Sequence, residues 1–201
     1  NILSVTVVDD VPIAEDATRE VFIPKQDTNV QLILDFSLSM TYKIDDGHGN
    51  DTTGLKIMKE SALVLMDTYD NLGDVKVQIV TFSLSKGLTD KSTTVTDSGG
   101  SKWMSVSDAE HYISNLDDGD MIYYTNYDDA LVEAKDSFVD PGKTAGAENV
   151  SYFLTDGKPT PGHEIGTGTP EETSWTTFLD TNDINAFAYG LGAGAKPDSL
   201  H

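Results

Sequence analysis

The sequence predicts an α/β domain with a mainly parallel, doubly wound sheet and helices on both of its faces, preceded by a short N-terminal extended segment. Two observations lead to this fold class. Short apolar runs typical of strands alternate with longer segments in which apolar residues recur at helical spacing. The run 30–34 is apolar at every position except Gln31, as expected for a central strand that helices cover on both sides.

The N-terminal part is predicted to lie outside the main domain. Residues 1–8 alternate as a strand, and Pro12 follows shortly after it. We interpret residues 1–12 as the tail of a preceding module, 13–28 as a linker and 29–201 as the domain itself. A chain of 201 residues is long enough for one such domain with its own core.

The other elements follow in chain order. Residues 43–53 are rich in Gly, Asp and Asn and are predicted to form a loop. A helix is predicted from Leu55 to Tyr69, ending near Gly73, because its apolar residues recur at helical spacing. Ser107 and Glu110 have the spacing of a capping box and predict the start of another helix. The remaining predicted elements are a strand over 75–82, an edge hairpin over 84–95, helices over 127–138 and 171–179, and strands over 149–154 and 184–189.

The composition excludes several functions. Lys and Arg number 13 against 34 Asp and Glu, which gives a net charge of −21. Such a chain has no basic footprint for nucleic acid, and anionic membrane surfaces would repel it. No run is apolar enough for membrane insertion. The absence of Cys rules out disulfides and thiolate zinc sites, whereas divalent cations would neutralise the excess acid. This composition suits a bacterial extracellular setting that contains calcium.

Three oxygen-bearing side chains follow the central strand. Asp35, Ser37 and Ser39 lie on one side if the chain stays extended beyond Leu34. Open α/β sheets bind ligands at the carboxyl ends of their strands, and carboxylate and hydroxyl oxygens suit Ca²⁺ or Mg²⁺. We expect Asp35 to be a surface carboxylate. The alternative is that these residues cap the next helix.

Two later segments extend this group. Thr155-Asp156-Gly157 ends the predicted strand 149–154, and Thr125 precedes the predicted helix 127–138. The strand ends would place Asp35 and Asp156 side by side at one edge of the sheet. Two carboxylates with a few hydroxyls do not enclose Ca²⁺ fully, so they suit a cation that keeps waters and one open position. Taken alone, Thr125 would also fit as a helix N-cap.

These three segments resemble the von Willebrand factor type A domain over residues 28–201. The resemblance implies a Rossmann-like fold with a metal-ion-dependent adhesion site (MIDAS), in which an acidic side chain of the partner completes the cation's shell. The implied metal ligands are Asp35, Ser37, Ser39, Thr125 and Asp156. The rim of the ligand-binding surface is expected at Phe36, Tyr127, Gly157 and Lys158. The resemblance also implies a further strand and a C-terminal helix after residues 190–192.

The segment from Val5 to Pro12 resembles the end of an immunoglobulin-like repeat in large bacterial RTX adhesins. This resemblance implies an extracellular module at the bacterial cell surface, with a role in cell adhesion and biofilm formation. The expected partners are a protein or glycan bound through the metal, together with neighbouring adhesin modules. We expect the module to be a monomer.

Two further cation sites are considered. Asp45, Asp46 and Asp51 would supply a second metal site, although a solvated acidic loop is the simpler interpretation. Asp9 and Asp10 would bind Ca²⁺ at a junction between modules.

The leading functional hypothesis is a non-enzymatic adhesion module that uses a metal as the bridge to its partner. One alternative is a calcium-stiffened spacer that binds no ligand. Another is a Mg²⁺-dependent phosphatase with Asp35 as nucleophile, but Ser37 stands where such enzymes place their second acid.

Overall fold

A computed structural model describes residues 25–45, 51–157 and 159–191. The central sheet consists of β1 (Thr28–Asp35), β4 (Val75–Phe82), β5 (Thr93–Thr94), β6 (Glu148–Thr155) and β7 (Ile184–Gly190). The helices are α1 (Gly54–Asp70), α2 (Val106–Ser114), α3 (Tyr127–Phe138) and α4 (Pro170–Thr181). The smaller elements are β2 (Lys43–Asp45), β3 (Asp51–Thr53) and the 3-10 turns η1 (Leu38–Thr41) and η2 (Asp118–Asp120).

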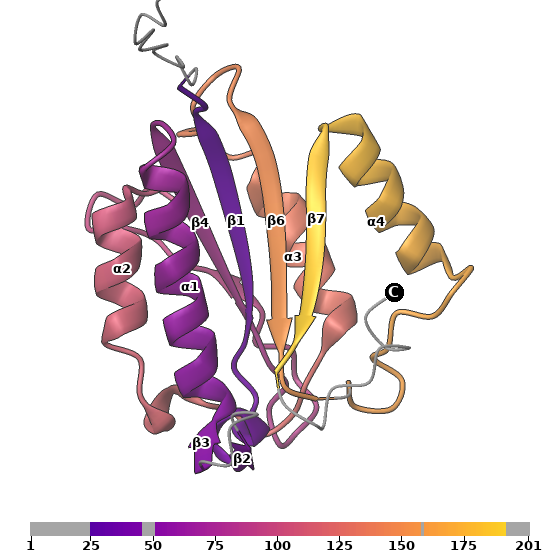
Figure 1. The fold of residues 1–201 in the computed structure, drawn as a ribbon. Coiled ribbons are helices and arrows are strands. Elements are labelled where there is room, and N and C mark those ends of the chain that lie inside the picture. The colour runs from indigo at the N-terminus through magenta and orange to yellow at the C-terminus, as the bar shows by residue number, and fades with distance from the viewer. Residues whose placement is uncertain (1–24, 46–50, 158, 192–201) are drawn as a thin grey trace, which may run out of the picture.

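The sheet has the order β5-β4-β1-β6-β7, in which β4, β1, β6 and β7 run parallel and β5 pairs antiparallel with β4. Helices α1 and α2 cover one face, and α3 and α4 lie on the other (Figure 1). The predicted doubly wound α/β class is therefore confirmed.

Strand β1 is the central strand of the sheet, and every one of its side chains is buried. Val30, Leu32 and Leu34 belong to the core cluster beneath α1 and α2, whereas Ile33 packs into the cluster beneath α3. The polar Gln31 is satisfied, since its amide donates to Gln78 Oε1 at 2.8 Å and its carbonyl accepts from Ser151 Oγ at 3.0 Å. Hydrogen bonds across three strands thus hold a polar side chain inside the sheet.

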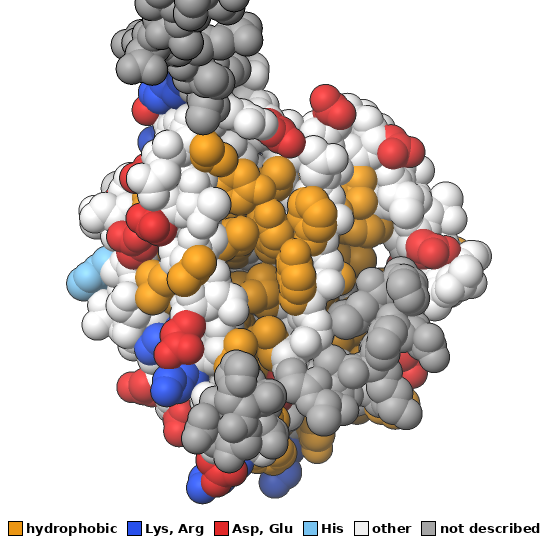
Figure 2. Space-filling view, viewed as in Figure 1, with side chains coloured by type: hydrophobic (Ala, Val, Ile, Leu, Met, Phe, Trp, Pro, Cys, Tyr) orange, Lys and Arg blue, Asp and Glu red, His pale blue; other side chains and the backbone are white. Residues whose placement is uncertain are grey.

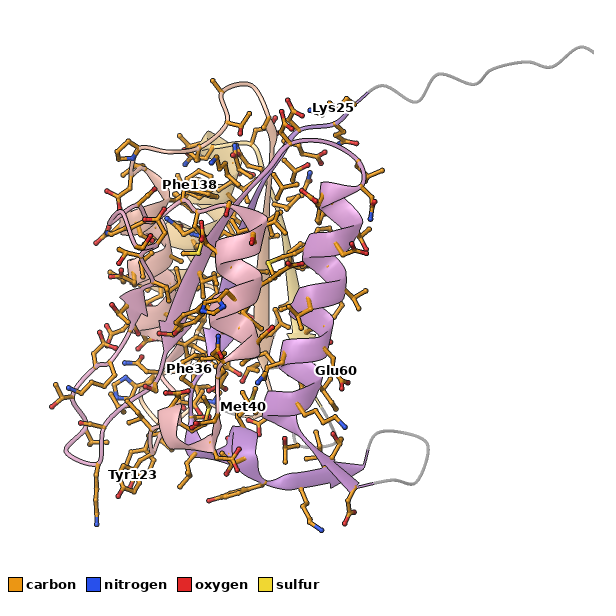
Figure 3. The ribbon with its side chains drawn as sticks, turned by 90° about the vertical axis from the view of Figure 1, so that its left-hand side faces the viewer. Lys25, Phe36, Met40, Glu60, Tyr123 and Phe138 are labelled. Carbon is orange, nitrogen blue, oxygen red and sulfur yellow. The ribbon has the colours of Figure 1, made fainter. Side chains whose placement is uncertain are left out.

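The registers of the strands bring two strand ends together. Leu34 pairs with Leu154, so Asp35 and Thr155 leave neighbouring strands at the same level. The chain then turns inward, and Phe36 and Met40 point into the protein near this end of the sheet, far from Phe138 (Figure 3). At this edge of the sheet, the polar residues that end the strands therefore lie next to buried apolar side chains.

Two local predictions were wrong. Residues 43–53 include an antiparallel ribbon, β2–β3, in which Asp45 pairs with Asp51, rather than a loop throughout. Helix α2 begins earlier than the capping-box spacing suggested, because Ser105 is its N-cap and accepts a hydrogen bond from Asp108 N at 3.1 Å. Ser107 lies within the helix, so its spacing to Glu110 was a coincidence of sequence.

An apolar surface lies over the last two strands. Phe187 and Tyr189 on β7 are 44% and 50% exposed and stack beside Tyr152 of β6. Figure 2 shows hydrophobic side chains gathered on this face of the sheet. Within the described ranges, no helix is both long and apolar enough to span a membrane.

The turn after α1 requires glycine at position 73, because there is no room for a side chain there. A Cβ at Gly73 would overlap the Gln26 carbonyl and approach Asp27 N to 2.8 Å. We expect Gly73→Ala to lower the free energy of unfolding by about 1–3 kcal/mol, as overpacking does. Chemical denaturation measures this, with the exposed Gly87→Ala as the control, whose Cβ would meet nothing nearer than 4.0 Å. Equal stability of both variants would contradict the close packing.

Candidate metal centre

Asp35 is the most firmly held side chain of the site. It is fully buried at the end of β1. Its Oδ1 accepts a hydrogen bond from Ser37 N at 2.8 Å, and its Oδ2 accepts a short hydrogen bond from Thr155 Oγ1 on β6. The carboxylate therefore ties two parallel strands together where they end. The expectation that Asp35 is a surface carboxylate was wrong.

The two serines connect Asp35 to Asp156. Ser37 Oγ lies 3.0 Å from Ser39 Oγ, and Ser39 Oγ donates to Asp156 Oδ1 at 2.8 Å. Ser37 stands at the N-cap position of η1 but makes no side-chain capping hydrogen bond. Four of the five predicted ligands thus form one connected group, and the alternative of a helix cap does not account for the serine hydroxyls.

Asp156 lies against the start of α1. It is 7% exposed, and a Cβ on Gly54 would come within 3.1 Å of both Asp156 Cβ and Met40 Sδ. The missing side chain of Gly54 thus lets the first turn of α1 approach Asp156 closely.

Thr125 lies in a neighbouring segment but contacts none of the other four ligands through a hydrogen bond that the structure describes. Its backbone is held by Thr160, whose N donates to Thr125 O at 2.9 Å. Nearby, Ile122 N donates to Phe36 O at 2.7 Å, which fixes this segment beside the site. The N-cap of α3 is Asn126, whose Oδ1 accepts from Asp129 N. The interpretation of Thr125 as a helix cap is therefore wrong.

The structure places the expected rim residues differently from one another. Phe36 and Tyr127 are only 7% and 2% exposed, so they lie beneath the site and not on a rim. A Cβ at Gly157 would lie 3.8 Å from Ser39 Oγ, which puts Gly157 beside the predicted ligands. Lys158 lies outside the described residues.

The other predicted cation sites stay predictions. Asp51 is exposed and forms an ion pair with Lys43 at 2.9 Å, and Asp45 pairs with it along the backbone of the β2–β3 ribbon. Asp46, Asp9 and Asp10 lie outside the described residues. Across the part of the chain that the structure describes, no three His, Asp or Glu side chains gather in a way that would hold a metal.

The site concentrates uncompensated negative charge. Burial raises the pKa of Asp35 to about 6, against the opposing hydrogen bonds from Ser37 and Thr155, and Asp156 adds repulsion. Burial also raises the pKa of Asp156, opposed by Ser39. None of the ion pairs between described residues involves either carboxylate. An all-oxygen set with two buried acids and no basic partner fits a hard divalent cation.

Thr155 belongs to the predicted motif but was not among the five predicted metal ligands. Its hydroxyl is the donor that holds Asp35 Oδ2, and it also lies 3.3 Å from Gly157 N. The feature that could have revealed this role is the position of Thr155 in the chain. It ends a strand that pairs in parallel with the strand ending in Asp35.

Comparisons with known proteins identify the fold. No protein-family model matches the chain, and neither does any curated protein. Among solved structures, proximal thread matrix protein 1 from the mussel byssus, with a zinc-occupied MIDAS motif, matches 87% of this chain and 40% of its own at 19% identity and a TM-score of 0.57. The PilB minor pilin of Streptococcus sanguinis matches 86% of this chain and 52% of its own, at 13% identity and a TM-score of 0.57.

A von Willebrand factor type A protein from Catenulispora acidiphila matches 88% of this chain and 35% of its own, at 20% identity and a TM-score of 0.53. The chain therefore spans about half or less of the length of these proteins. At identities this low, the structural similarity establishes the fold but not the function. The fold is that of the von Willebrand factor type A domain, as the sequence predicted.

The buried acid at position 35 makes the stability of the metal-free protein depend on pH. Its pKa in the folded state, about 6, exceeds the ordinary 3.8. The contribution of Asp35 to stability is therefore complete below about pH 4 and is lost as the pH rises through about 6. In EDTA at pH 7, we expect Asp35→Asn to be more stable than the wild type by up to about 3 kcal/mol.

Urea denaturation of both proteins at pH 4 and pH 7 measures this difference. The advantage of the variant should shrink towards zero at pH 4, where the wild-type acid is protonated. A difference that stays constant with pH would contradict the assigned charge state.

Proposed function

We propose that this chain is a non-enzymatic binding module that holds Ca²⁺ or Mg²⁺ through Asp35, Ser37, Ser39, Thr125 and Asp156. The observation that carries the proposal is the connected group of two buried carboxylates and two serine hydroxyls at the carboxyl edge of the sheet. Bound there, the cation supplies positive charge that attracts an acidic group from outside.

The residues have different parts in this proposal. Asp35 has both oxygens engaged by the protein and contributes charge from below. Ser37 and Ser39 offer neutral oxygens, and Asp156 uses only one of its oxygens in the hydrogen bonds that the structure describes. Two carboxylates just balance a divalent ion. A carboxylate of a protein partner, or the oxygens of a glycan, would then complete the shell.

The position of Asp35 favours binding over catalysis. A phosphatase nucleophile must reach the phosphorus atom, whereas Asp35 is fully buried and both of its oxygens accept hydrogen bonds. The spacer alternative differs in its expected outcome, since a spacer would bind cations without binding a partner.

The proposed setting is a bacterial surface adhesin of the RTX type, acting outside the cell in adhesion and biofilm formation. The strongly acidic, Cys-free composition supports this setting. The shared fold with a minor pilin is compatible with it.

Cation binding is tested through Ser39, which is half-buried and bridges Ser37 to Asp156. We expect Ser39→Ala to weaken Mg²⁺ and Ca²⁺ binding by roughly tenfold. Removing one liganding oxygen is expected to cost about 1.4 kcal/mol of binding free energy, which corresponds to that change in affinity. Isothermal titration calorimetry measures both affinities. Ser107→Ala, at an exposed position in α2, is the matched control and should bind like the wild type. Unchanged affinity in Ser39→Ala would remove this residue from the ligand set.

Cation binding should also stabilise the folded protein. A ligand at a hundredfold excess over its Kd adds about 2.7 kcal/mol, which for a chain of this size raises Tm by roughly 5–10 °C. Differential scanning calorimetry in EDTA, in Mg²⁺ and in Ca²⁺ measures the shift. Identical melting curves under all three conditions would argue against the metal site. A second experiment separates an adhesion module from a spacer, because only an adhesion module would capture a ligand in the presence of the cation and release it in EDTA.

A further inference from the structure

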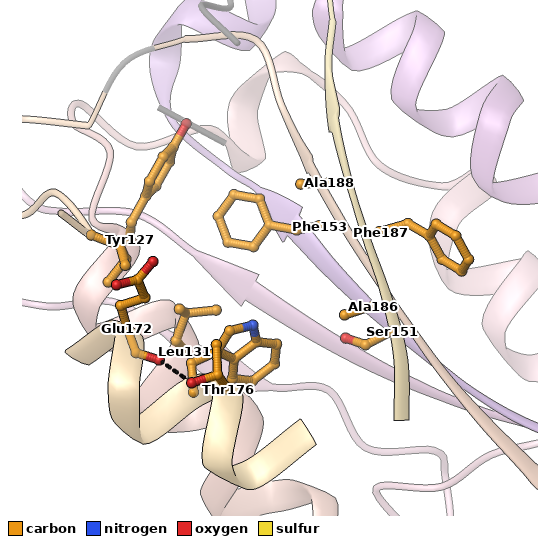
Figure 4. A pocket seen from close by; sticks show the side chains of 11 residues that line it. Tyr127, Leu131, Ser151, Phe153, Glu172, Thr176, Ala186, Phe187 and Ala188 are labelled. Atoms are coloured by element: carbon orange, nitrogen blue, oxygen red, sulfur yellow. Dashed lines mark hydrogen bonds between the residues drawn. The ribbon is translucent and has the colours of Figure 1, made fainter. Parts of the chain in front are cut away.

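Tyr127 joins the aromatic core to the predicted cation site. It is the first residue of α3 and is 2% exposed, with its ring edge-on to Phe82 and Phe153 at centroid distances of 5.9 and 4.9 Å. The ring forms one wall of a groove between α3, α4 and strands β6 and β7, and its hydroxyl points away from Glu172 and Thr176 (Figure 4).

The hydroxyl reaches the segment that carries Asp156. Tyr127 Oη lies 2.8 Å from Gly157 O and 3.2 Å from Thr155 Oγ1. A carbonyl only accepts, so the single phenolic proton goes to Gly157 O or is shared with Thr155. The Thr155 hydroxyl donates its own hydrogen bond to Asp35 Oδ2. Burial raises the pKa of the Tyr127 hydroxyl, which therefore stays protonated and remains a donor.

The two groups that Tyr127 contacts flank Asp156 in the chain. Thr155 fixes Asp35, and Gly157 lies beside Ser39. One rigid phenol therefore contacts the backbone carbonyl that follows Asp156 and the Thr155 hydroxyl that donates to Asp35. The ring cannot follow a displaced turn, because Phe82 and Phe153 pack against it.

We infer that Tyr127 is a positioning residue for the cation site, acting through the Thr155-Asp156-Gly157 turn without touching the ion. This inference rests on the proposed function. Partners of this indirect kind typically change metal affinity by about 10–100-fold. Mg²⁺ requires stricter ligand geometry than Ca²⁺, so a loosened turn should penalise Mg²⁺ more.

The test compares Tyr127→Phe with Tyr69→Phe. Each variant removes only a phenolic oxygen from a packed ring. The Tyr69 hydroxyl lies 2.7 Å from the Tyr152 hydroxyl. Tyr69 is in the last turn of α1, whereas the first turn of this helix lies beside Asp156. The 17 residues of this helix separate the two positions by roughly 20 Å or more. Calorimetric titration with Mg²⁺ and with Ca²⁺ is done on the 201-residue chain, and urea denaturation in EDTA measures stability.

We expect Tyr127→Phe to lose roughly tenfold or more in Mg²⁺ affinity and less in Ca²⁺ affinity, while Tyr69→Phe binds both ions like the wild type. Wild-type Mg²⁺ affinity in Tyr127→Phe would overturn the inference and leave the proposed function intact. An equal loss in Tyr69→Phe would also overturn it, by showing a general effect of destabilisation. A wild-type protein that binds neither ion would overturn the proposed function and this inference together.

Discussion

The burial of the Asp35 carboxylate between two strand ends is the constraint on which the site depends. An ionised carboxylate inside a protein is costly unless donors surround it. Here one donor comes from the following turn and the other from Thr155 on the neighbouring strand. The carboxylate can keep both only while β1 and β6 remain in register, so the geometry of the site is set by the pairing of the sheet.

The two acids of the site are not equivalent. Asp35 is committed to the protein through both oxygens, whereas Asp156 accepts only from Ser39 in the hydrogen bonds that the structure describes. Asp156 therefore has more freedom to interact with something outside the domain. Its position depends on Gly54 from one side and on its own flanking residues from the other, which places the first turn of α1 and the end of β6 in control of the open side of the site.

The apolar pattern predicted most of the fold, because strands β1, β4 and β6 and helices α1 and α3 bury most of the apolar side chains that carry the pattern. The peripheral β7 and α4 were also predicted, although β7 buries only Ile184 and no residue of α4 is buried. The grouping of Asp35, Ser37, Ser39 and Asp156 also followed from the sequence, since parallel strands end at one edge. Burial could not be predicted in the same way. Phe36 lies between two predicted ligands in the sequence and Tyr127 lies two residues after Thr125, but both side chains point inward and are buried.

Other features escaped prediction for local reasons. The β2–β3 ribbon is two strands of three residues each, too short for a periodic signal, and two serines near the start of α2 offered equivalent caps. The role of Tyr127 was hidden because its ring and its hydroxyl serve different surroundings. The ring fills an aromatic cluster, and the oxygen meets the turn that carries Asp156. A tyrosine can therefore connect the rigid aromatic core to the turn that carries Asp156 at the edge of the sheet.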